Sequence, residues 1–378
     1  MTVGIDARSL RHQPTGVGRY VRNLLTSMTP LLDHSRSEGT AGIDLRVYVP
    51  AGSAGTVDGR VRVVELGAAL LDNIVTWSHV RLPLQLLRHP VDLLHAPFYT
   101  LPAFCPCPAV VTIHDITFDL HPEWYTRRAR IAFGGFARAS ARKARHVLTV
   151  SERSRSDIIA AYGVPPEHVT AVPLAPDPLL KRVEDPSELG RVRAKYAQGS
   201  EYALHVGSIT PRRNIGRLLD AFAAVRRRAR DLVLVLAGRV EPPSGPIEAD
   251  IRRRGLEGAV RVAGYVEAAD LPALYSAASV VVYPSLYEGF GLPVIEAMAC
   301  GVPALASTGS CFEDLVGDAA LLIDPTDTAA LEEGIWAILS DTTLRGRLIE
   351  RGLARAAGYT WERTARETLE VYRRAGGL

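Results

Sequence analysis

Short apolar runs alternate with stretches of helical periodicity along nearly the whole chain. The apolar runs carry few polar residues, which is typical of parallel strands buried on both faces. In the first half we predict strands at Val3–Asp6, Leu45–Val49, Val61–Leu66, Leu93–His95, Val110–His114, Val147–Ser151 and Val169–Pro173. In the second half we predict them at Ala203–Gly207, Leu232–Ala237, Val260–Ala263, Ser279–Tyr283, Ala304–Ser307 and Leu321–Ile323. Strands and helices alternating twice over predict two doubly wound α/β domains.

A proline-rich segment separates the two halves of the pattern. Four prolines fall within residues 173–186, just before a charged helical stretch. A chain of 378 residues also exceeds the usual size of a single-domain core. We therefore predict an N-terminal domain at 1–178 and a C-terminal domain at 179–360, and the tail 361–378 has the pattern of an amphipathic helix.

Composition excludes several classes of protein. Hydrophobic residues make up 47% of the chain and no window approaches the roughly 18 uninterrupted apolar residues of a membrane span. The N-terminus leads directly into the first predicted strand, so we expect no signal peptide and a cytoplasmic location. A net charge of +3 is too small to indicate nucleic acid. The four cysteines, with no C-x-x-C spacing, are expected to be free thiols.

The stretch 287–298 carries the clearest chemical signal. It follows a β-branched run, contains a glycine turn, and continues as a helix opened by Pro293. The backbone N–H groups expected to point out, unpaired, at the helix N-terminus are those of Phe290, Gly291 and Leu292, and Gly289 before them is also expected in the binding site. Such a terminus suits a phosphate. Glu288 can face a hydroxyl-rich group and Glu296 can accept hydrogen bonds from a ribose diol, so together they indicate a nucleotide sugar. The simpler alternative is a strand–turn–helix corner with solvated glutamates.

This arrangement resembles the E-x7-E motif of the retaining glycosyltransferases of family 4. The resemblance spans nearly the whole chain, with its motifs in family order. It implies the GT-B fold: two Rossmann-like domains facing a central cleft, with the C-terminal helix crossing back to the N-terminal domain. It also implies that the C-terminal domain binds most of the nucleotide-sugar donor and that the N-terminal domain binds the acceptor.

Two adjacent arginines follow the first predicted strand of the second domain. Arg212 and Arg213 stand at a predicted helix start, where a pair of guanidinium groups can clamp a diphosphate. The segment that begins at Gly207 resembles the family's G-x-x-x-P-R-K-N stretch, whose basic pair holds the donor pyrophosphate. Arg213 stands where lysine is usual, and Ser208 stands where other members carry a further arginine, so we expect that contact to be missing. Taken alone, arginines at helix starts are more often simply solvated.

A histidine ends one buried strand of the first domain. His114 and Asp115 resemble the family's H-D pair, whose histidine contacts the donor sugar. A lone histidine at this place is more often structural, although the strand end favours a functional role. Asp115 is expected to orient His114 or to cap the following segment.

Two further segments give weaker signals. Gly16 lies in a glycine loop after the first strand, and the loop resembles one whose backbone approaches the donor phosphates. Tyr265 and Val266 resemble the segment that borders the nucleotide base. Each is explained nearly as well by a tight connection or by packing.

The stretch 127–145 holds seven basic residues and no acidic ones. On a helix, one side would gather Arg127, Arg130, Arg138, Arg142 and Arg145. A basic stripe on the acceptor domain could bind phosphorylated lipid or rest on the inner membrane face. A surface helix whose apolar side packs on the sheet is the favoured alternative.

The sequence thus predicts a retaining, metal-independent hexosyltransferase that uses a nucleotide-diphosphate sugar and a glycan, glycolipid or natural-product acceptor. The sequence contains no D-x-D motif, so we expect the diphosphate to bind without a metal ion. We also expect no cofactor. The loop Thr15–Tyr20, of sequence Thr-Gly-Val-Gly-Arg-Tyr, resembles that of mannosyl- and rhamnosyltransferases, which weakly favours GDP-mannose. A phosphorylase, a nucleotide-sugar epimerase and a non-catalytic binding subunit stay open as alternatives. The residues expected to act in catalysis are Glu288, His114, Arg212 and Arg213.

Overall fold

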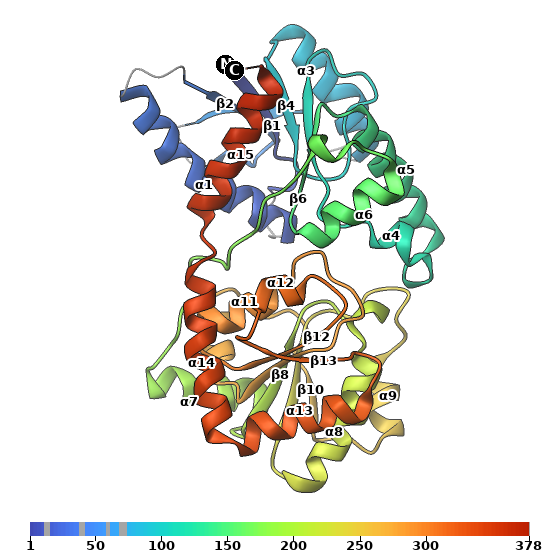
Figure 1. The fold of residues 1–378 in the computed structure, drawn as a ribbon, viewed down its shortest axis with the longest axis vertical. Coiled ribbons are helices and arrows are strands. Elements are labelled where there is room, and N and C mark those ends of the chain that lie inside the picture. Colours follow the sequence, from blue (N-terminus) through green and yellow to red (C-terminus); the bar gives the residue numbers. More distant parts are fainter. Residues whose placement is uncertain (11–15, 38–41, 58–60, 68–73, 378) are drawn as a thin grey trace. The chain divides into compact units, whose positions relative to one another are not determined.

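The computed structural model describes residues 1–10, 16–37, 42–57, 61–67 and 74–377. These residues form two compact units, which we describe separately (Figure 1). Unit 1 comprises 1–120, 127–174 and 360–378, and unit 2 comprises 121–126 and 175–359. The boundary predicted between residues 178 and 179 stays a prediction.

Unit 1 is built on a seven-stranded parallel sheet of order β3-β2-β1-β4-β5-β6-β7. Its strands are β1 (Thr2–Asp6), β2 (Asp44–Pro50), β3 (Arg62–Leu66), β4 (Leu93–Ala96), β5 (Ala109–Thr112), β6 (His146–Thr149) and β7 (Val169–Ala171). Its α-helices are α1 (Gly16–Ser37), α2 (Ile74–Thr76), α3 (Leu82–Arg88), α4 (Thr117–Leu120), α5 (Arg127–Lys143), α6 (Glu152–Tyr162) and α15 (Trp361–Gly376). The strand order reverses between β1 and β4, as it does in Rossmann folds.

The last helix, α15, belongs to unit 1 although unit 2 precedes it in the chain. It packs along α1 and touches β4, β5 and β6 (Figure 1). The hydroxyl of Tyr372 lies 2.6 Å from Nδ1 of His95, and Nε2 of His95 lies 2.7 Å from the hydroxyl of Thr112. His95 is completely buried, and burial lowers its pKa to about 3, so the imidazole stays neutral. The predicted return of the C-terminal helix is confirmed.

Unit 2 is built on a six-stranded parallel sheet of order β10-β9-β8-β11-β12-β13. Its strands are β8 (Tyr202–Val206), β9 (Val233–Ala237), β10 (Val260–Val262), β11 (Val280–Tyr283), β12 (Ala304–Ser307) and β13 (Leu321–Ile323). Its α-helices are α7 (Pro186–Ala197), α8 (Ile215–Arg228), α9 (Ile247–Arg253), α10 (Leu271–Ser276), α11 (Leu292–Ala299), α12 (Phe312–Val316), α13 (Thr328–Ser340) and α14 (Thr342–Ala357).

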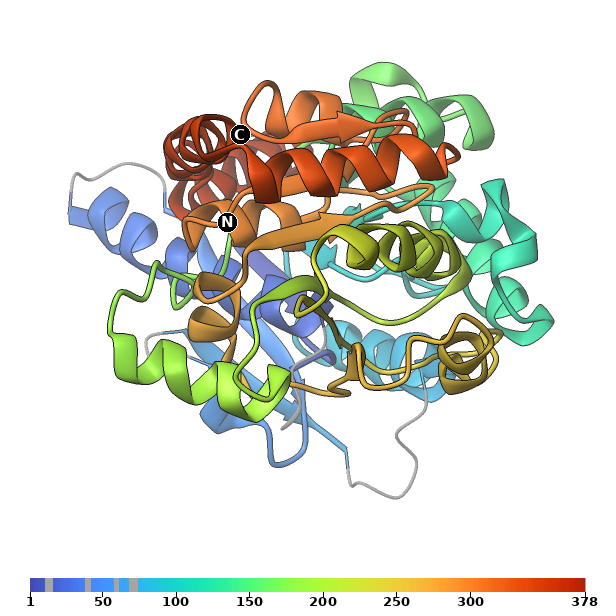
Figure 2. The same cartoon turned by 90° about the horizontal axis from the view of Figure 1, so that it is seen from below.

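Successive side chains of the central strands of unit 2 point to opposite faces of the sheet and pack into two separate hydrophobic cores. Val280 and Val282 of β11 pack with α8, α9 and α13, whereas Val281 packs with α7, α10 and α11. Figures 1 and 2 show α8 and α13 side by side on their face of the sheet. Because both faces are covered by helices, the strands read as continuous apolar runs in the sequence.

All of the predicted strands are present, with small differences at their ends. The strand expected to reach His114 stops at Thr112, because the chain leaves the sheet there for the loop that precedes α4. Cys300, expected inside a helix, caps α11 instead, and Gly301 follows with a φ of +69° that ends the helix. All four cysteines are free, as predicted. Among the described residues, no helix is both long and apolar enough to span a bilayer.

Candidate donor and acceptor sites

In unit 2 three of the residues predicted to act in catalysis lie where the strand order reverses. β8 and β11 are parallel neighbours in the sheet, with Val280 opposite Ala203. The strands that follow β8 in the chain lie on one side of this pair, and those that follow β11 lie on the other. Loops after adjacent strands on the two sides of such a point diverge and leave room for a ligand. The loop after β8 carries Arg212 and Arg213, and the loop after β11 carries Glu288.

The two arginines and the glutamate contact one another. Arg213 forms an ion pair with Oε1 of Glu288, and Nη1 of Arg212 lies 3.5 Å from Oε2. Glu288 is buried, with 5% of its surface exposed, so its charge needs these partners. The carboxylate balances one of the two guanidinium charges. The cluster therefore keeps a net positive charge, which suits a diphosphate.

Asn214 holds this cluster in place, and the sequence argument did not identify it. It adopts a left-handed φ of +58°, and its Nδ2 donates to the carbonyls of Pro284 at 3.1 Å and Pro325 at 2.7 Å. The amide of Leu286 also donates to the carbonyl of Arg212 at 2.8 Å. The bonds to Pro284 and from Leu286 tie the loop after β8 to the loop after β11, and the bond to Pro325 ties it to the segment after β13. An asparagine directly after a basic pair was the available signal.

Two glycines are required by the local geometry. Gly207 has a φ of +138°, and a Cβ there would lie 3.5 Å from the hydroxyl of Tyr283. Gly291 has a φ of +90°, and a Cβ there would collide with the ring of Phe312. Both positions thus need glycine for backbone reasons, independently of any ligand.

The segment after β11 enters α11 as the sequence predicts, with Pro293 in the first turn. Gly289 and Phe290 are buried, and the ring of Phe290 lies edge-on to Tyr359 at 5.9 Å. Glu296 lies one turn into the helix with 3% of its surface exposed. Its Oε2 accepts a hydrogen bond from the hydroxyl of Tyr275 at 2.9 Å. The tyrosine was not identified from the sequence.

The segment expected beside the nucleotide base divides between surface and core. Tyr265 is 51% exposed, and the guanidinium of Arg239 lies 5.3 Å from its ring centroid. Val266 is 7% exposed and packs in the core on the α7 side of the sheet. The structure therefore leaves only Tyr265 with a side chain at the surface.

In unit 1 the residue expected to contact the sugar sits among aromatic rings. His114 is half-buried, with the rings of Tyr20 at 5.0 Å and Tyr99 at 6.0 Å, both edge-on. Its Nε2 lies 3.3 Å from the carbonyl of Pro97. Because a carbonyl can only accept, Nε2 carries the proton and Nδ1 is an acceptor. Burial lowers the pKa of His114, which favours the neutral imidazole.

The residues beside His114 have structural tasks. Oδ1 of Asp115 accepts from the amide of Thr117 at 3.0 Å and from its hydroxyl, so this carboxylate caps α4. That is one of the two roles expected for it. Gly16 begins α1 and is exposed, and no atom of the described residues lies within 4 Å of a would-be Cβ there. Thr15, which precedes it in the motif, lies outside the described residues.

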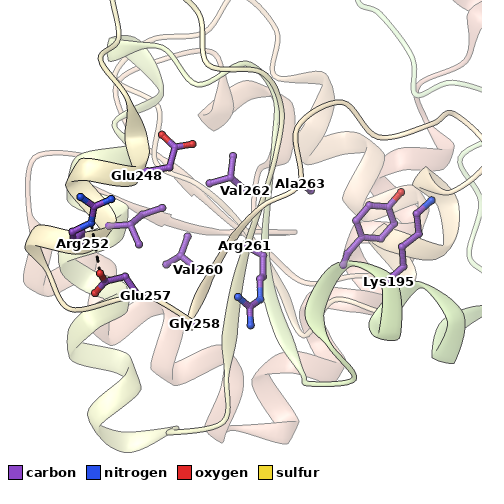
Figure 3. Close-up of a pocket in the computed structure, with 11 residues that line it drawn as sticks. Lys195, Glu248, Arg252, Glu257, Gly258, Val260, Arg261, Val262 and Ala263 are labelled. Carbon is purple, nitrogen blue, oxygen red and sulfur yellow. Dashed lines mark ion pairs between the residues drawn. The ribbon is translucent and has the colours of Figure 1, made fainter.

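A cavity of about 660 Å³ lies beside β10, one of the two edge strands of the unit 2 sheet (Figure 3). Among the described residues, those that line it come mainly from β10, α9 and α7 and include Lys195. None of them is a predicted donor residue. Nζ of Lys195 donates to Oδ2 of Asp270 at 2.7 Å, and this bond raises the pKa of the lysine. A phosphorylase needs a lysine that can form an imine with its cofactor. An ammonium held by a carboxylate is poorly suited to that task.

Two family models match the chain. Residues 14–178 match "Glycosyltransferase Family 4", and residues 191–355 match "Glycosyl transferases group 1". The O-antigen chain mannosyltransferase B of Escherichia coli is 32% identical over 99% of this chain and 100% of its own length. The MMP alpha-(1->4)-mannosyltransferase of Mycolicibacterium hassiacum is 34% identical over 71% of this chain and 66% of its own length.

Among solved structures, sucrose-phosphate synthase from Thermosynechococcus elongatus has a TM-score of 0.76 at 20% identity. The match covers 99% of this chain and 98% of that one, and at this identity it shows the fold alone. The fold is GT-B, with a Rossmann-like sheet in each unit. The chain therefore belongs to the group 1 glycosyltransferases of family 4, enzymes that transfer a sugar from a nucleotide-sugar donor to an acceptor.

Proposed function

We propose that this enzyme is a retaining mannosyltransferase that takes its sugar from GDP-mannose and transfers it to a hydroxyl of a glycan or glycolipid. The observation that carries the proposal is the cluster of Arg212, Arg213 and Glu288 at the switch point of unit 2, close in sequence to α11. Two relatives with mannosyltransferase names favour mannose among the hexoses.

In this proposal unit 2 binds the donor and unit 1 binds the acceptor. The arginines bind the diphosphate, the N-terminus of α11 adds partial positive charge, and Glu296 binds the ribose. Glu288 faces the sugar hydroxyls. His114 accepts a hydrogen bond from a sugar hydroxyl at Nδ1, because its other nitrogen is already a donor.

The transfer proceeds on one face of the sugar. The bond from the anomeric carbon to the phosphate oxygen breaks, and a bond to the acceptor oxygen forms on the same face. A donor phosphate oxygen takes the proton from the acceptor hydroxyl. Arg212 and Arg213 stabilise the negative charge of the departing diphosphate, and we propose that no metal ion takes part.

A panel of nucleoside diphosphates in thermal unfolding experiments tests the donor assignment. GDP at a hundredfold excess over its dissociation constant should stabilise the enzyme by about 2.7 kcal/mol, and UDP, ADP and dTDP should do so less. Glu296→Ala should lose most of this effect. Stabilisation by UDP instead would reassign the donor, and no stabilisation by any of them would refute the site.

The anomeric outcome needs a direct measurement. Proton NMR of the product formed from GDP-mannose and an O-antigen-type oligosaccharide should show the α-anomer, as in the donor. A β-linked product would contradict the retaining chemistry.

We also propose that the N-terminal half of α5 rests on an anionic membrane surface. Arg127 and Arg130 are exposed there, and Ile131 is 67% exposed. In the other half, Arg138 lies over the ring of Tyr162, and Nε of Arg142 donates to the carbonyl of the same tyrosine. Only the first half therefore suits phospholipid headgroups.

Vesicle sedimentation tests the membrane contact. The enzyme should co-sediment with vesicles that contain phosphatidylglycerol and much less with pure phosphatidylcholine. The double variant Arg127→Glu, Arg130→Glu should lose the difference while keeping its activity on a water-soluble acceptor. Unchanged sedimentation of this variant would exclude α5 as the contact.

A further inference from the structure

A buried tyrosine meets the carboxylate that is assigned to the donor ribose. Tyr275 is completely buried on α10, and its hydroxyl donates to Oε2 of Glu296 at 2.9 Å. Glu296 itself is 3% exposed. A charge-assisted hydrogen bond between two buried groups is strong and short-ranged, so it fixes the rotation of the carboxylate about its own axis.

Further hydrogen bonds hold α10, the helix that carries Tyr275, in place. Tyr202 donates from its hydroxyl to the carbonyl of Leu274 at 2.6 Å, which anchors α10 to β8. The hydroxyl of Ser276 donates to the carbonyl of Cys300 at 3.4 Å and accepts from the amide of Val183 at 3.0 Å. These bonds fix α10 against the end of α11, so that Tyr275 meets Glu296 from a rigid support.

The phenol is a permanent donor in this setting. Burial, reinforced by the neighbouring Glu296 carboxylate, raises the pKa of Tyr275 well above its usual range. Burial and the same carboxylate raise the pKa of Cys300 to about 12, so its thiol is uncharged. At neutral pH Tyr275 therefore keeps its proton and donates it as a hydrogen bond to Oε2 of Glu296.

We propose that Tyr275 is a positioning residue that orients the Glu296 carboxylate for the two hydroxyls of the donor ribose. The inference rests on the proposed role of Glu296 and extends it to a residue that never touches the donor. A diol binds a carboxylate best when both oxygens lie in the plane of its two hydroxyls. The hydrogen bond to Oε2 sets that plane before the donor arrives, which removes a rotational cost from binding.

Paired nucleotides test the proposal, because they report on the ribose contact alone. Calorimetric titration with GDP and with 2′,3′-dideoxy-GDP should show that the wild-type enzyme prefers the ribose form by about 10- to 100-fold. In Tyr275→Phe the preference should fall by about tenfold, while affinity for the dideoxy form stays within about twofold. Equal loss for both nucleotides, or no loss for either, would overturn the proposal.

Tyr202→Phe is the matched control. It removes a hydroxyl from another fully buried tyrosine that supports the same helix, but one that bonds a backbone carbonyl instead of Glu296. Its preference for the ribose form should equal that of the wild type. If it loses the preference as Tyr275→Phe does, the effect comes from loosening α10, and the positioning role is refuted.

Two further measurements separate the possible failures. If Glu296→Ala keeps the ribose preference, the assignment of Glu296 to the ribose is wrong and the proposed donor site fails with it. If Glu296→Ala loses the preference and Tyr275→Phe keeps it, only the tyrosine proposal fails. Should Tyr275→Phe not fold, 3-fluorotyrosine at position 275 serves instead. Its ¹⁹F resonance should move with GDP and stay in place with the dideoxy form, and equal movement with both would refute the proposal.

Discussion

The corner after β8 and β11 in unit 2 is built from charge, whereas the corner after β4 and β5 in unit 1 is built from rings. In unit 2, Arg213 and Glu288 meet as ions. In unit 1, a histidine with a lowered pKa lies between two tyrosines, edge-on to both. The two sheets share the same strand order apart from the additional β7 of unit 1, so the topology sets only where a site would lie. The residues after the strands set whether it acts through charge or through neutral hydrogen bonds.

The largest effect should come from the charged corner. Arg212→Ala should lower turnover by about 10²- to 10³-fold, because the lost guanidinium no longer stabilises the diphosphate as it departs. Initial rates with GDP-mannose measure this, and circular dichroism should show an intact fold. Arg252→Ala, which removes a guanidinium with 73% of its side chain exposed, is the matched control and should keep its rate. Near wild-type turnover in Arg212→Ala would contradict the assignment.

The neutral corner should respond less and without pH dependence. His114→Gln should lower kcat/KM by about tenfold, the worth of one hydrogen bond. Because burial holds the pKa of His114 below its usual 6.5, the imidazole stays neutral above that pH. We therefore expect no change in the shape of the rate profile between pH 6.5 and 8 when the variant replaces the wild type. An inflection in this range that disappears in His114→Gln would show that a charged imidazole acts.

The unfolding free energy of unit 1 should depend on pH because of the buried His95. The pKa of His95 is about 3 in the folded state, below the usual 6.5, so between these values the unfolded chain binds a proton that the folded chain does not. Stability is then complete above pH 6.5 and is lost as the pH falls toward 3, by up to about 1.4 kcal/mol per pH unit. Denaturant unfolding of His95→Gln should show a flatter pH dependence. An unchanged slope in His95→Gln would refute the account.

The smallest effect should come from the hydroxyls around that histidine. Tyr372→Phe leaves Nδ1 of buried His95 without the partner that it has at 2.6 Å, and should cost about 1 kcal/mol of unfolding free energy. Tyr20→Phe removes a contact of 3.4 Å to Thr112 and should cost a few tenths of a kcal/mol. Urea unfolding curves measure both. The reverse order would mean that the short bond is not the stronger one.

The strands could be predicted from sequence because burial on both faces leaves an uninterrupted apolar run, as at Val280–Val282. The glycines and charged residues of the loops after β8 and β11 could be singled out because their spacing is local. The roles of Asn214 and Tyr275 could not, because each acts through contacts with residues distant in sequence. Asn214 bonds to Pro325, 111 residues away. Tyr275 bonds to Glu296 on α11, the next helix in the chain, with β11 between the two helices. No periodicity within either segment records such partners.

The same limit explains the histidine corner. The tautomer of His114 depends on the carbonyl of Pro97. The aromatic rings beside the imidazole come from α1 and from the loop after β4. The sequence places a histidine after a strand, and only the fold shows which nitrogen is the acceptor. Val266 illustrates the reverse case, because a side chain expected to be available for a base is required by the core.

The return of α15 to unit 1 has a consequence for synthesis on the ribosome. The chain leaves unit 1 after Leu174, completes all of unit 2, and only then supplies Tyr372 to the buried His95. Unit 2 is contiguous apart from a six-residue segment, so it can close as soon as it emerges. Unit 1 has to wait for the 185 residues 175–359 before α15 can pack along α1 and against β4, β5 and β6, so the part translated first is the last to be finished.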